Sequence, residues 1–273
     1  GTNDELLGCQ RDVTNMHKML TEQLGFSSNN IQVLTESSGQ LPTQANILAA
    51  LDNIVTQAKQ YGSSEVMIYY SGHGLQMLDR DQNVETRESD GMDEVLVPLD
   101  HHNGLIRDDT LQKYLSQFPT NCICLGIFDS CNSGTVVDLP YKYLYDPQTE
   151  TCTPTRDTVH TPYNNTVISV SGCKDWQTSS VVREGGQWNS ALTTAIRNIL
   201  GPTQQHVTLY QLQKSLIDYM IQNDLDQRPV VCCSWEAPPG TLLLTKRPSA
   251  TVKQSPYTEL DLVQGWLDMY KYV

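Results

Sequence analysis

The chain has 273 residues, of which 38 % are hydrophobic and 18 % charged, a balance typical of a globular protein and not of a disordered chain or a small disulfide scaffold. Its 31 acidic residues outnumber the 18 basic ones, so the net charge of −13 repels phosphate backbones and we expect no nucleic-acid partner. No apolar run approaches the roughly 20 residues of a membrane-spanning helix, so we expect no membrane span.

The first elements are two helices and a strand. Hydrophobic residues at helical spacing predict a helix over residues 13–24, which ends near Gly25, and a second helix over 47–55. A β-branched and aromatic run at 65–70 predicts a buried strand. The strand leads directly into Ser71-Gly72-His73-Gly74, a glycine-flanked loop with one histidine.

A second strand also leads into a loop with a reactive residue type. The polar stretch 79–93 predicts a long loop, a short strand follows around 95–97, and Asp108 or Asp109 caps a helix that ends at Phe118-Pro119. The apolar run 122–128 then predicts a buried strand that ends at Asp129-Ser130-Cys131-Asn132-Ser133-Gly134.

The remaining segments complete an alternating pattern. We expect an irregular insertion at 139–165, a strand at 167–170, a polar loop up to Gln187, helices at 189–200 and 208–223, and a strand at 229–234. Alternating strands and helices predict an α/β fold with a largely parallel sheet. In such a sheet the ligand site lies beyond the carboxyl ends of the strands, where His73 and Cys131 both fall.

Cys131 is the best candidate nucleophile among eight cysteines. It lies between small polar residues after a strand, whereas Cys122, Cys124, Cys232 and Cys233 lie in apolar runs. A neighbouring histidine can take the proton of a thiol and so generate the reactive thiolate. Taken singly, Cys131 could be a surface cysteine in a turn and His73 a structural histidine. The cysteine placement favours free thiols and a reducing, cytoplasmic compartment.

Several motifs together resemble the metacaspases, a family of caspase-like cysteine proteases, over about residues 5–235. The motifs are Gly8-Cys9-Gln10-Arg11-Asp12, Ser71-Gly72-His73-Gly74, Asp90-Gly91-Met92-Asp93-Glu94 with Pro98-Leu99-Asp100, Asp129-Ser130-Cys131-Asn132-Ser133-Gly134, Ser171-Gly172-Cys173-Lys174-Asp175 and Gln227-Arg228-Pro229. The resemblance implies a caspase-like α/β/α sandwich with a mostly parallel central sheet, and a monomer. It divides one catalytic domain into a large-subunit-like part (1–138), a linker (139–165), a small-subunit-like part (166–245) and a tail (246–273).

The resemblance also implies roles for the residues of the two loops. His73 matches the general base and Cys131 the nucleophile of the family's dyad, and the backbone amides of Gly74 and Cys131 would stabilise the oxyanion.

By the same resemblance, Asp12 and Asp129 receive a basic P1 side chain, the residue before the cleaved bond, and Cys9 and Ser71 help to line this pocket. Two carboxylates suit Arg or Lys by charge and by hydrogen bonding. Asp12 alone could instead cap a helix.

Four aspartates match a calcium site of the family: Asp93, Asp108, Asp109 and Asp138. Carboxylate oxygens are the ligands that Ca²⁺ prefers. Asp108 and Asp109 could instead cap a helix and interact favourably with its dipole.

Three features depart from the family or extend the comparison. A first core strand before Gly8 is absent, so we expect the natural chain to begin earlier, and Asn132 stands where many metacaspases have histidine. Lys142 and Arg156 are candidate self-cleavage sites, or solvated loop charges.

The sequence therefore predicts a calcium-stimulated cysteine endopeptidase of the type I metacaspase kind that cleaves after Arg or Lys. Two alternatives remain: a catalytically idle, caspase-like scaffold protein and a calcium-independent protease of the paracaspase kind.

Overall fold

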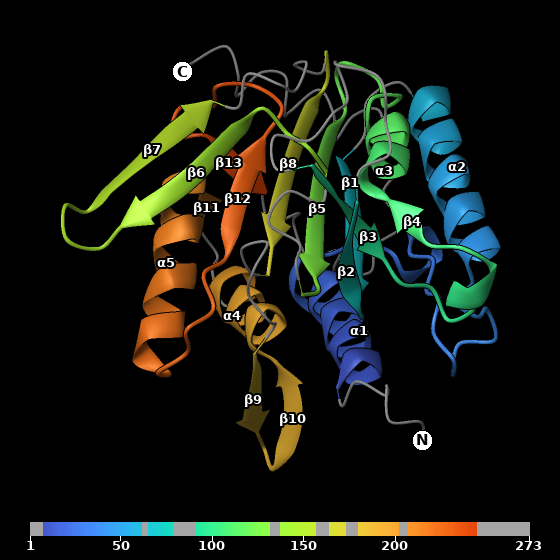
Figure 1. Ribbon diagram of the computed structural model, residues 1–273, viewed down its shortest axis with the longest axis horizontal. Helices are drawn as coiled ribbons and strands as arrows, with labels where there is room; N and C mark the ends of the chain where they lie inside the picture. Colours follow the sequence, from blue (N-terminus) through green and yellow to red (C-terminus); the bar gives the residue numbers. More distant parts are fainter. Residues whose placement is uncertain are drawn as a thin grey trace, which may run out of the picture.

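The computed structural model describes residues 8–61, 65–78, 91–131, 137–156, 164–172, 180–201 and 207–244 (Figure 1). Its centre is a six-stranded sheet in the order β1-β5-β8-β12-β6-β7. The strands are β1 (Glu65–Ser71), β5 (Ile123–Asp129), β8 (Thr166–Ser171), β12 (Val230–Cys233), β6 (Tyr141–Asp146) and β7 (Thr151–Arg156).

The direction of the strands agrees with the predicted α/β class. β1, β5 and β8 pair in parallel. β12 pairs antiparallel with both β8 and β6, so β6 runs in the same direction as β8, and only β12 and β7 run against the rest. The sheet is therefore mixed, with most of its strands in one direction.

Helices cover both faces of this sheet (Figure 1). One face carries α1 (Cys9–Lys18), α4 (Ala191–Leu200) and α5 (Leu209–Gln222), and the other carries α2 (Gln44–Tyr61) and α3 (Asp108–Leu115).

Side chains alternate between the two cores along β5, because successive residues of a strand point to opposite faces. Leu125 and Ile127 pack in the core with α1, α4 and α5, and Cys124 and Phe128 pack in the core with α2 and α3. Burial on both faces explains why the run 122–128 is apolar throughout. The predicted α/β/α sandwich is confirmed.

A separate three-stranded antiparallel sheet holds two acidic residues, Asp93 and Glu94. It consists of β2 (Gly74–Leu78), β3 (Met92–Leu96) and β4 (Ile106–Arg107), and β4 continues directly into α3. The other short elements are η1 (Met19–Gln23), η2 (Ser28–Asn30), η3 (His101–Asn103), β9 (Val181–Glu184), β10 (Gln187–Ser190), β11 (Val207–Thr208) and β13 (Leu242–Leu244).

The irregular insertion predicted at 139–165 is wrong for residues 141–156, which form the β6–β7 hairpin of the central sheet. Tyr143 and Tyr145 are buried on β6 whereas Leu144 between them is exposed, which is the alternation of a half-buried strand. The Tyr143 hydroxyl donates a hydrogen bond of 2.7 Å to the carbonyl oxygen of Ala237. These contacts to distant segments stabilise β6, whose partner strand β7 was concealed by its threonine and proline residues.

The prediction of a polar loop up to Gln187 is also wrong in part, because β9 and β10 form a hairpin over residues 181–190. The predicted tail 246–273 lies outside the described residues, as do Asn132 and Cys173.

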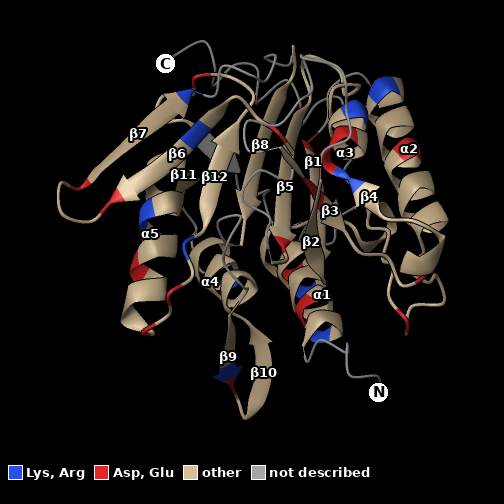
Figure 2. Cartoon of the chain, viewed as in Figure 1, with Lys and Arg blue, Asp and Glu red and all other residues tan. Residues whose placement is uncertain are grey.

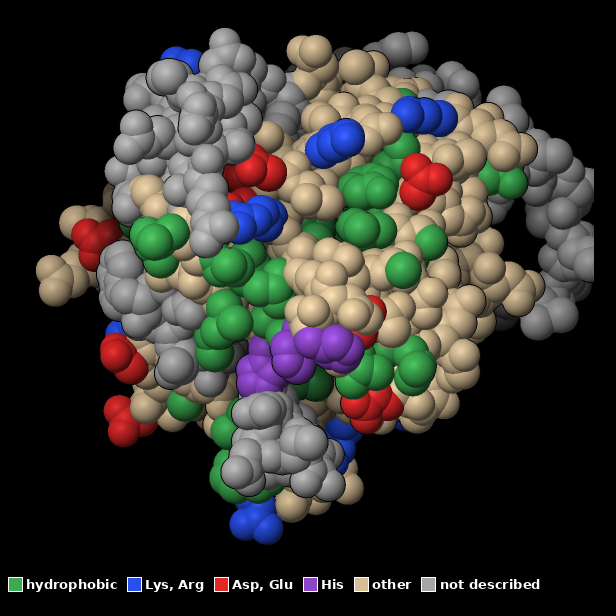
Figure 3. All heavy atoms as spheres, turned by 45° about the vertical axis from the view of Figure 1, so that its right-hand side comes forward, with side chains coloured by type: hydrophobic (Ala, Val, Ile, Leu, Met, Phe, Trp, Pro, Cys, Tyr) green, Lys and Arg blue, Asp and Glu red, His purple; other side chains and the backbone are tan. Residues whose placement is uncertain are grey.

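The view turned toward α2 shows hydrophobic and histidine side chains grouped together between scattered charged ones (Figure 3).

Within the described part of the chain, no helix combines the length and the apolar character that crossing a membrane requires.

Candidate active site

The candidate active site lies where β1 and β5 end. Ser71 and Asp129 are paired at the last position of the two parallel strands, and the amide of Gly72 donates to the carbonyl oxygen of Asp129 at 3.2 Å. His73 and Cys131 each follow this last pair by two residues. The register therefore brings both predicted dyad residues to one edge of the sheet.

Gly74 packs directly against the nucleophile loop. A Cβ atom at this position would overlap the carbonyl oxygen of Cys131 and would lie 3.0 Å from the side chain of Ser130. Only glycine allows this close approach of the two backbones. The carbonyl oxygen of His73 in turn accepts hydrogen bonds from the Tyr70 hydroxyl at 2.8 Å and from another backbone amide at 3.1 Å, so the position of the histidine backbone is fixed.

Exposure separates Cys131 from most of the other cysteines. Among the described residues, only Cys9 and Cys131 are partly exposed, and no described cysteine forms a disulfide. Burial, together with the charges of Asp12 and Asp129, raises the pKa of Cys9 to about 11, although a hydrogen bond with Ser71 opposes the shift. The Cys9 thiol thus stays protonated at neutral pH and is a poor nucleophile.

Two buried carboxylates lie next to this edge. Asp12, on α1, is 1 % exposed, and Asp129, at the end of β5, is 3 % exposed. Both oxygens of Asp12 accept from the amide of Ser190 at 3.2 Å. Oδ2 of Asp129 accepts from the amide of Thr193 at 3.1 Å and from its hydroxyl at 2.5 Å. The Asp12 side chain does not cap its own helix, so the capping alternative fails for this residue.

The two carboxylates influence each other electrostatically. Burial, and then the nearby charge of Asp129, raise the pKa of Asp12 to about 7, while the hydrogen bond from Ser190 opposes the shift. A basic group placed between the two carboxylates would relieve this repulsion.

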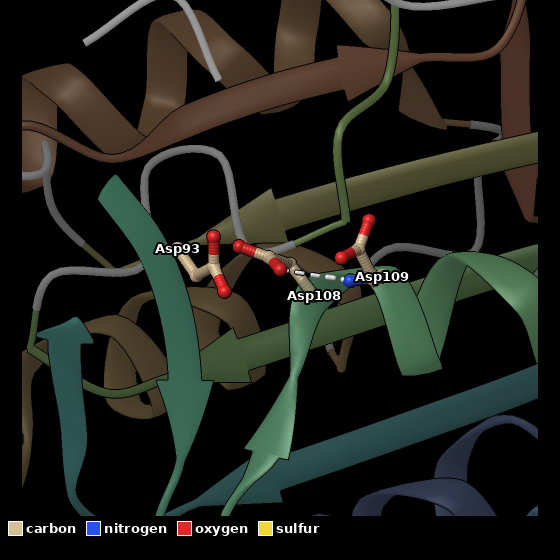
Figure 4. Close-up of side chains that lie close together, drawn as sticks. All are labelled: Asp93, Asp108 and Asp109. Carbon is tan, nitrogen blue, oxygen red and sulfur yellow. Dashed lines mark hydrogen bonds between the residues drawn. The ribbon is translucent and has the colours of Figure 1, made fainter. Parts of the chain in front are cut away.

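The predicted calcium ligands fall into two groups that share Asp108. In the first group, one carboxylate oxygen each of Asp93, Asp108 and Asp109 lie within 4.8 Å of one another (Figure 4). Asp93 comes from β3 and the other two from the start of α3. Arg107 on β4 forms an ion pair with Asp93. Figure 2 shows basic and acidic stretches of the chain adjoining at β4 and the start of α3.

The second group comprises Glu94, Asp108 and Asp138, all buried, with one oxygen each within the same 4.8 Å. Asp108 accepts from the amide of Glu94 at 2.5 Å and from that of Asp109 at 2.8 Å, so it both binds β3 and interacts with the start of α3. The capping alternative fails for Asp108 and Asp109, because Arg107 is the N-cap residue of α3 and no side chain caps this helix. Both aspartates nevertheless lie in its first turn, where the helix dipole favours a negative charge. Carboxylate oxygens from β3, α3 and Asp138, which lies before β6, are a donor set that fits a hard divalent cation such as Ca²⁺.

Residues 2–140 match the family description "Metacaspase, peptidase C14 domain". The chain belongs to the metacaspase family.

Curated metacaspases align with most of the chain. Metacaspase-1 of Debaryomyces hansenii is 30 % identical, over 86 % of this chain and 62 % of that protein. Metacaspase-1 of Cryptococcus neoformans is 32 % identical, over 86 % of this chain and 60 % of that protein. Metacaspase-1 of Candida albicans is 32 % identical, over 80 % of this chain and 59 % of that protein. The chain thus spans about three fifths of the length of these relatives.

A crystal structure of a protein from Geobacter sulfurreducens shares the fold, with a TM-score of 0.59 and 24 % identity over 92 % of each chain.

Three residues of this metacaspase that contact the predicted site residues were not predicted from the sequence. Glu94 joins the acidic cluster, and Ser190 and Thr193 bind the two buried carboxylates. Glu94 adjoins Asp93 and carried a detectable signal, because two consecutive acidic residues lie within a short strand that is otherwise apolar. Ser190 and Thr193 carried no signal, since their partners lie more than 60 residues away in sequence.

Proposed function

We propose that this metacaspase chain is a cysteine endopeptidase that hydrolyses peptide bonds after Arg or Lys and is stimulated by Ca²⁺. The observation that carries the proposal is the pair of buried carboxylates, Asp12 and Asp129, next to the strand end that presents Cys131. Membership of a peptidase family supports the reaction, and the carboxylate pair supports the specificity.

The reaction begins with proton transfer. The imidazole of His73 accepts the thiol proton of Cys131, and the resulting thiolate attacks the carbonyl carbon of the peptide bond. Backbone amides of Gly74 and Cys131 stabilise the negative charge on the carbonyl oxygen.

The carbon–nitrogen bond then breaks, and the departing amine takes the proton held by His73. An acyl group remains on the sulfur of Cys131. His73 next removes a proton from water, the hydroxide attacks the thioester, and the carboxylic acid leaves as the thiol re-forms.

Specificity follows from charge. A guanidinium or ammonium group at P1 would enter a site in which two carboxylates are already desolvated, so its approach is favoured by Coulomb attraction and by hydrogen bonding. An acidic P1 residue would add a third negative charge to the same site. We therefore expect cleavage after Arg and Lys and none after Asp.

The cation proposal rests on the acidic cluster of Asp93, Glu94, Asp108, Asp109 and Asp138. Bound Ca²⁺ would supply positive charge that offsets the repulsion between these carboxylates. Asp138 lies seven residues after Cys131, so a cation bound by Asp138 is held close in sequence to the nucleophile. This connection gives a physical reason for stimulation rather than simple stabilisation.

Paired fluorogenic peptides with Arg or Asp at P1, assayed with Ca²⁺ or with chelator, test the proposal. We expect calcium-dependent cleavage of the Arg peptide only, loss of that cleavage in Cys131→Ala, and its retention in Cys152→Ala, which removes a buried thiol on β7. A folded protein that cleaves neither peptide would overturn the proposed activity and would favour the idle scaffold. Equal cleavage with chelator would overturn only the role of calcium and would favour the paracaspase-like alternative.

A further inference from the structure

The first turn of α4 holds both carboxylates of the proposed P1 pocket. Ser190, directly before the helix, donates its amide to Asp12, and Thr193 donates both its amide and its hydroxyl to Asp129. Thr193 has 0 % exposure, so these bonds form away from water. The carboxylates, from α1 and β5, are thereby attached to a third element.

The direction of the hydrogen bonds around Thr193 follows from the chemistry of the groups. An ionised carboxylate only accepts, so the single hydroxyl proton of Thr193 points to Oδ2 of Asp129. The Tyr69 hydroxyl lies 2.6 Å from the Thr193 oxygen and must therefore donate to it. Burial and the charges of Asp129 and Asp12 raise the pKa of Tyr69 well above its usual range, so this donor keeps its proton.

Both bonds from Thr193 end on the same oxygen of Asp129. They fix the rotation of the carboxylate about its Cβ–Cγ bond and so set the direction of the other oxygen. A guanidinium donates its hydrogen bonds in fixed directions and therefore depends on where this other oxygen points, whereas an ammonium group behaves as a point charge.

We infer that Thr193 is a positioning residue that orients the Asp129 carboxylate for an arginine at P1. This inference rests on the proposed function and adds to it a preference for Arg over Lys. Thr193 does not touch the reacting atoms, and it acts through Asp129.

The test compares two adjacent threonines of α4. Thr193→Val removes the hydroxyl bound to Asp129. Thr194→Val is the matched control, because Thr194 is also buried but its hydroxyl donates to the carbonyl oxygen of Ser190. Thr193→Ser restores a hydroxyl at the first position.

KM and kcat are measured with otherwise identical Arg and Lys peptides. We expect Thr193→Val to raise KM for the Arg peptide about tenfold, as for loss of one hydrogen bond to a charged group, with little change in kcat. The effect on the Lys peptide should be smaller, so the ratio of kcat/KM for Arg to that for Lys falls. Thr193→Ser and Thr194→Val should keep the wild-type ratio.

Equal losses on both peptides, or the same ratio in Thr193→Val and Thr194→Val, would mean that Thr193 only packs and would overturn the inference. If Thr193→Val does not fold by circular dichroism, Thr193→Ala removes the same hydroxyl with a smaller side chain. An unchanged Arg to Lys ratio in that variant also overturns the inference. Failure of the proposed function is distinguishable, because it appears in the wild type as no preference for basic P1 residues.

Discussion

Asp12→Asn should stabilise the protein above pH 7 and should have little effect near pH 4. Burial and the charge of Asp129 raise the pKa of Asp12 from an ordinary 3.8 to about 7, so the folded protein binds this proton more tightly than the unfolded chain does. The contribution of Asp12 to stability is therefore fully present below about pH 4 and is lost as the pH rises to about 7. The asparagine is neutral at every pH and avoids this loss.

The magnitude follows from the pKa. A shift from 3.8 to about 7 corresponds to at most about 4 kcal/mol of destabilisation when Asp12 is ionised. The new amide must find acceptors of its own, which reduces the gain to roughly 1–2 kcal/mol. For a chain of this size we expect the midpoint of thermal unfolding to rise by about 2–8 °C at pH 8.

The assay is thermal unfolding of the wild type and Asp12→Asn across pH 4–8, followed by circular dichroism. Asp52→Asn is the control, because it makes the same chemical change at an exposed position on α2. A difference between Asp12→Asn and wild type that does not change with pH, or a lower midpoint for the variant at pH 8, would refute the account of two repelling buried carboxylates.

Three further predictions concern other contacts. Gly74→Ala should abolish peptide cleavage, because its methyl group would displace the backbone of Cys131; activity near the wild-type level would refute this packing. Arg107→Gln should lower the Kd for Ca²⁺, measured by isothermal titration calorimetry, because the cation no longer competes with an ion pair at Asp93; an unchanged or higher Kd would remove Arg107 from the site. Tyr143→Phe should lower the unfolding midpoint by about 2–4 °C through loss of one buried hydrogen bond, and no change in the midpoint would contradict that role.

The central part of the fold was predictable because its signals are local and consistent. The runs at 65–70, 122–128 and 167–170 are apolar and β-branched, and they become β1, β5 and β8 because both of their faces are covered by helices. The hairpin of β6 and β7 was not predictable in this way. Its burial depends on pairing with β12, about 90 residues further along the chain.

The same distinction applies to the candidate site. The sequence implied that His73 and Cys131 follow strands that end at one edge of the sheet, and the parallel pairing of β1 with β5 places both residues there. The anchoring of the carboxylates by Ser190 and Thr193 depends on how α4 docks on the sheet, which no local pattern specifies. Residues that hold a site by hydrogen bonds are ordinary serines and threonines in sequence, and only their partners distinguish them.

The burial of acidic groups links the pocket to the cation cluster. Among the described residues, six carboxylate side chains are buried and no Lys or Arg side chain is buried with them: Asp12, Asp93, Glu94, Asp108, Asp129 and Asp138. Buried charges of one sign destabilise a fold unless hydrogen bonds or bound cations compensate.

A basic P1 side chain and Ca²⁺ are cations of suitable chemistry for the two sites, so each should stabilise the folded protein as it binds. On this argument, the unfolding midpoint should rise with Ca²⁺ even in Cys131→Ala, which cannot turn over substrate. An unchanged midpoint at millimolar Ca²⁺ would show that the acidic cluster is compensated within the protein and does not bind calcium.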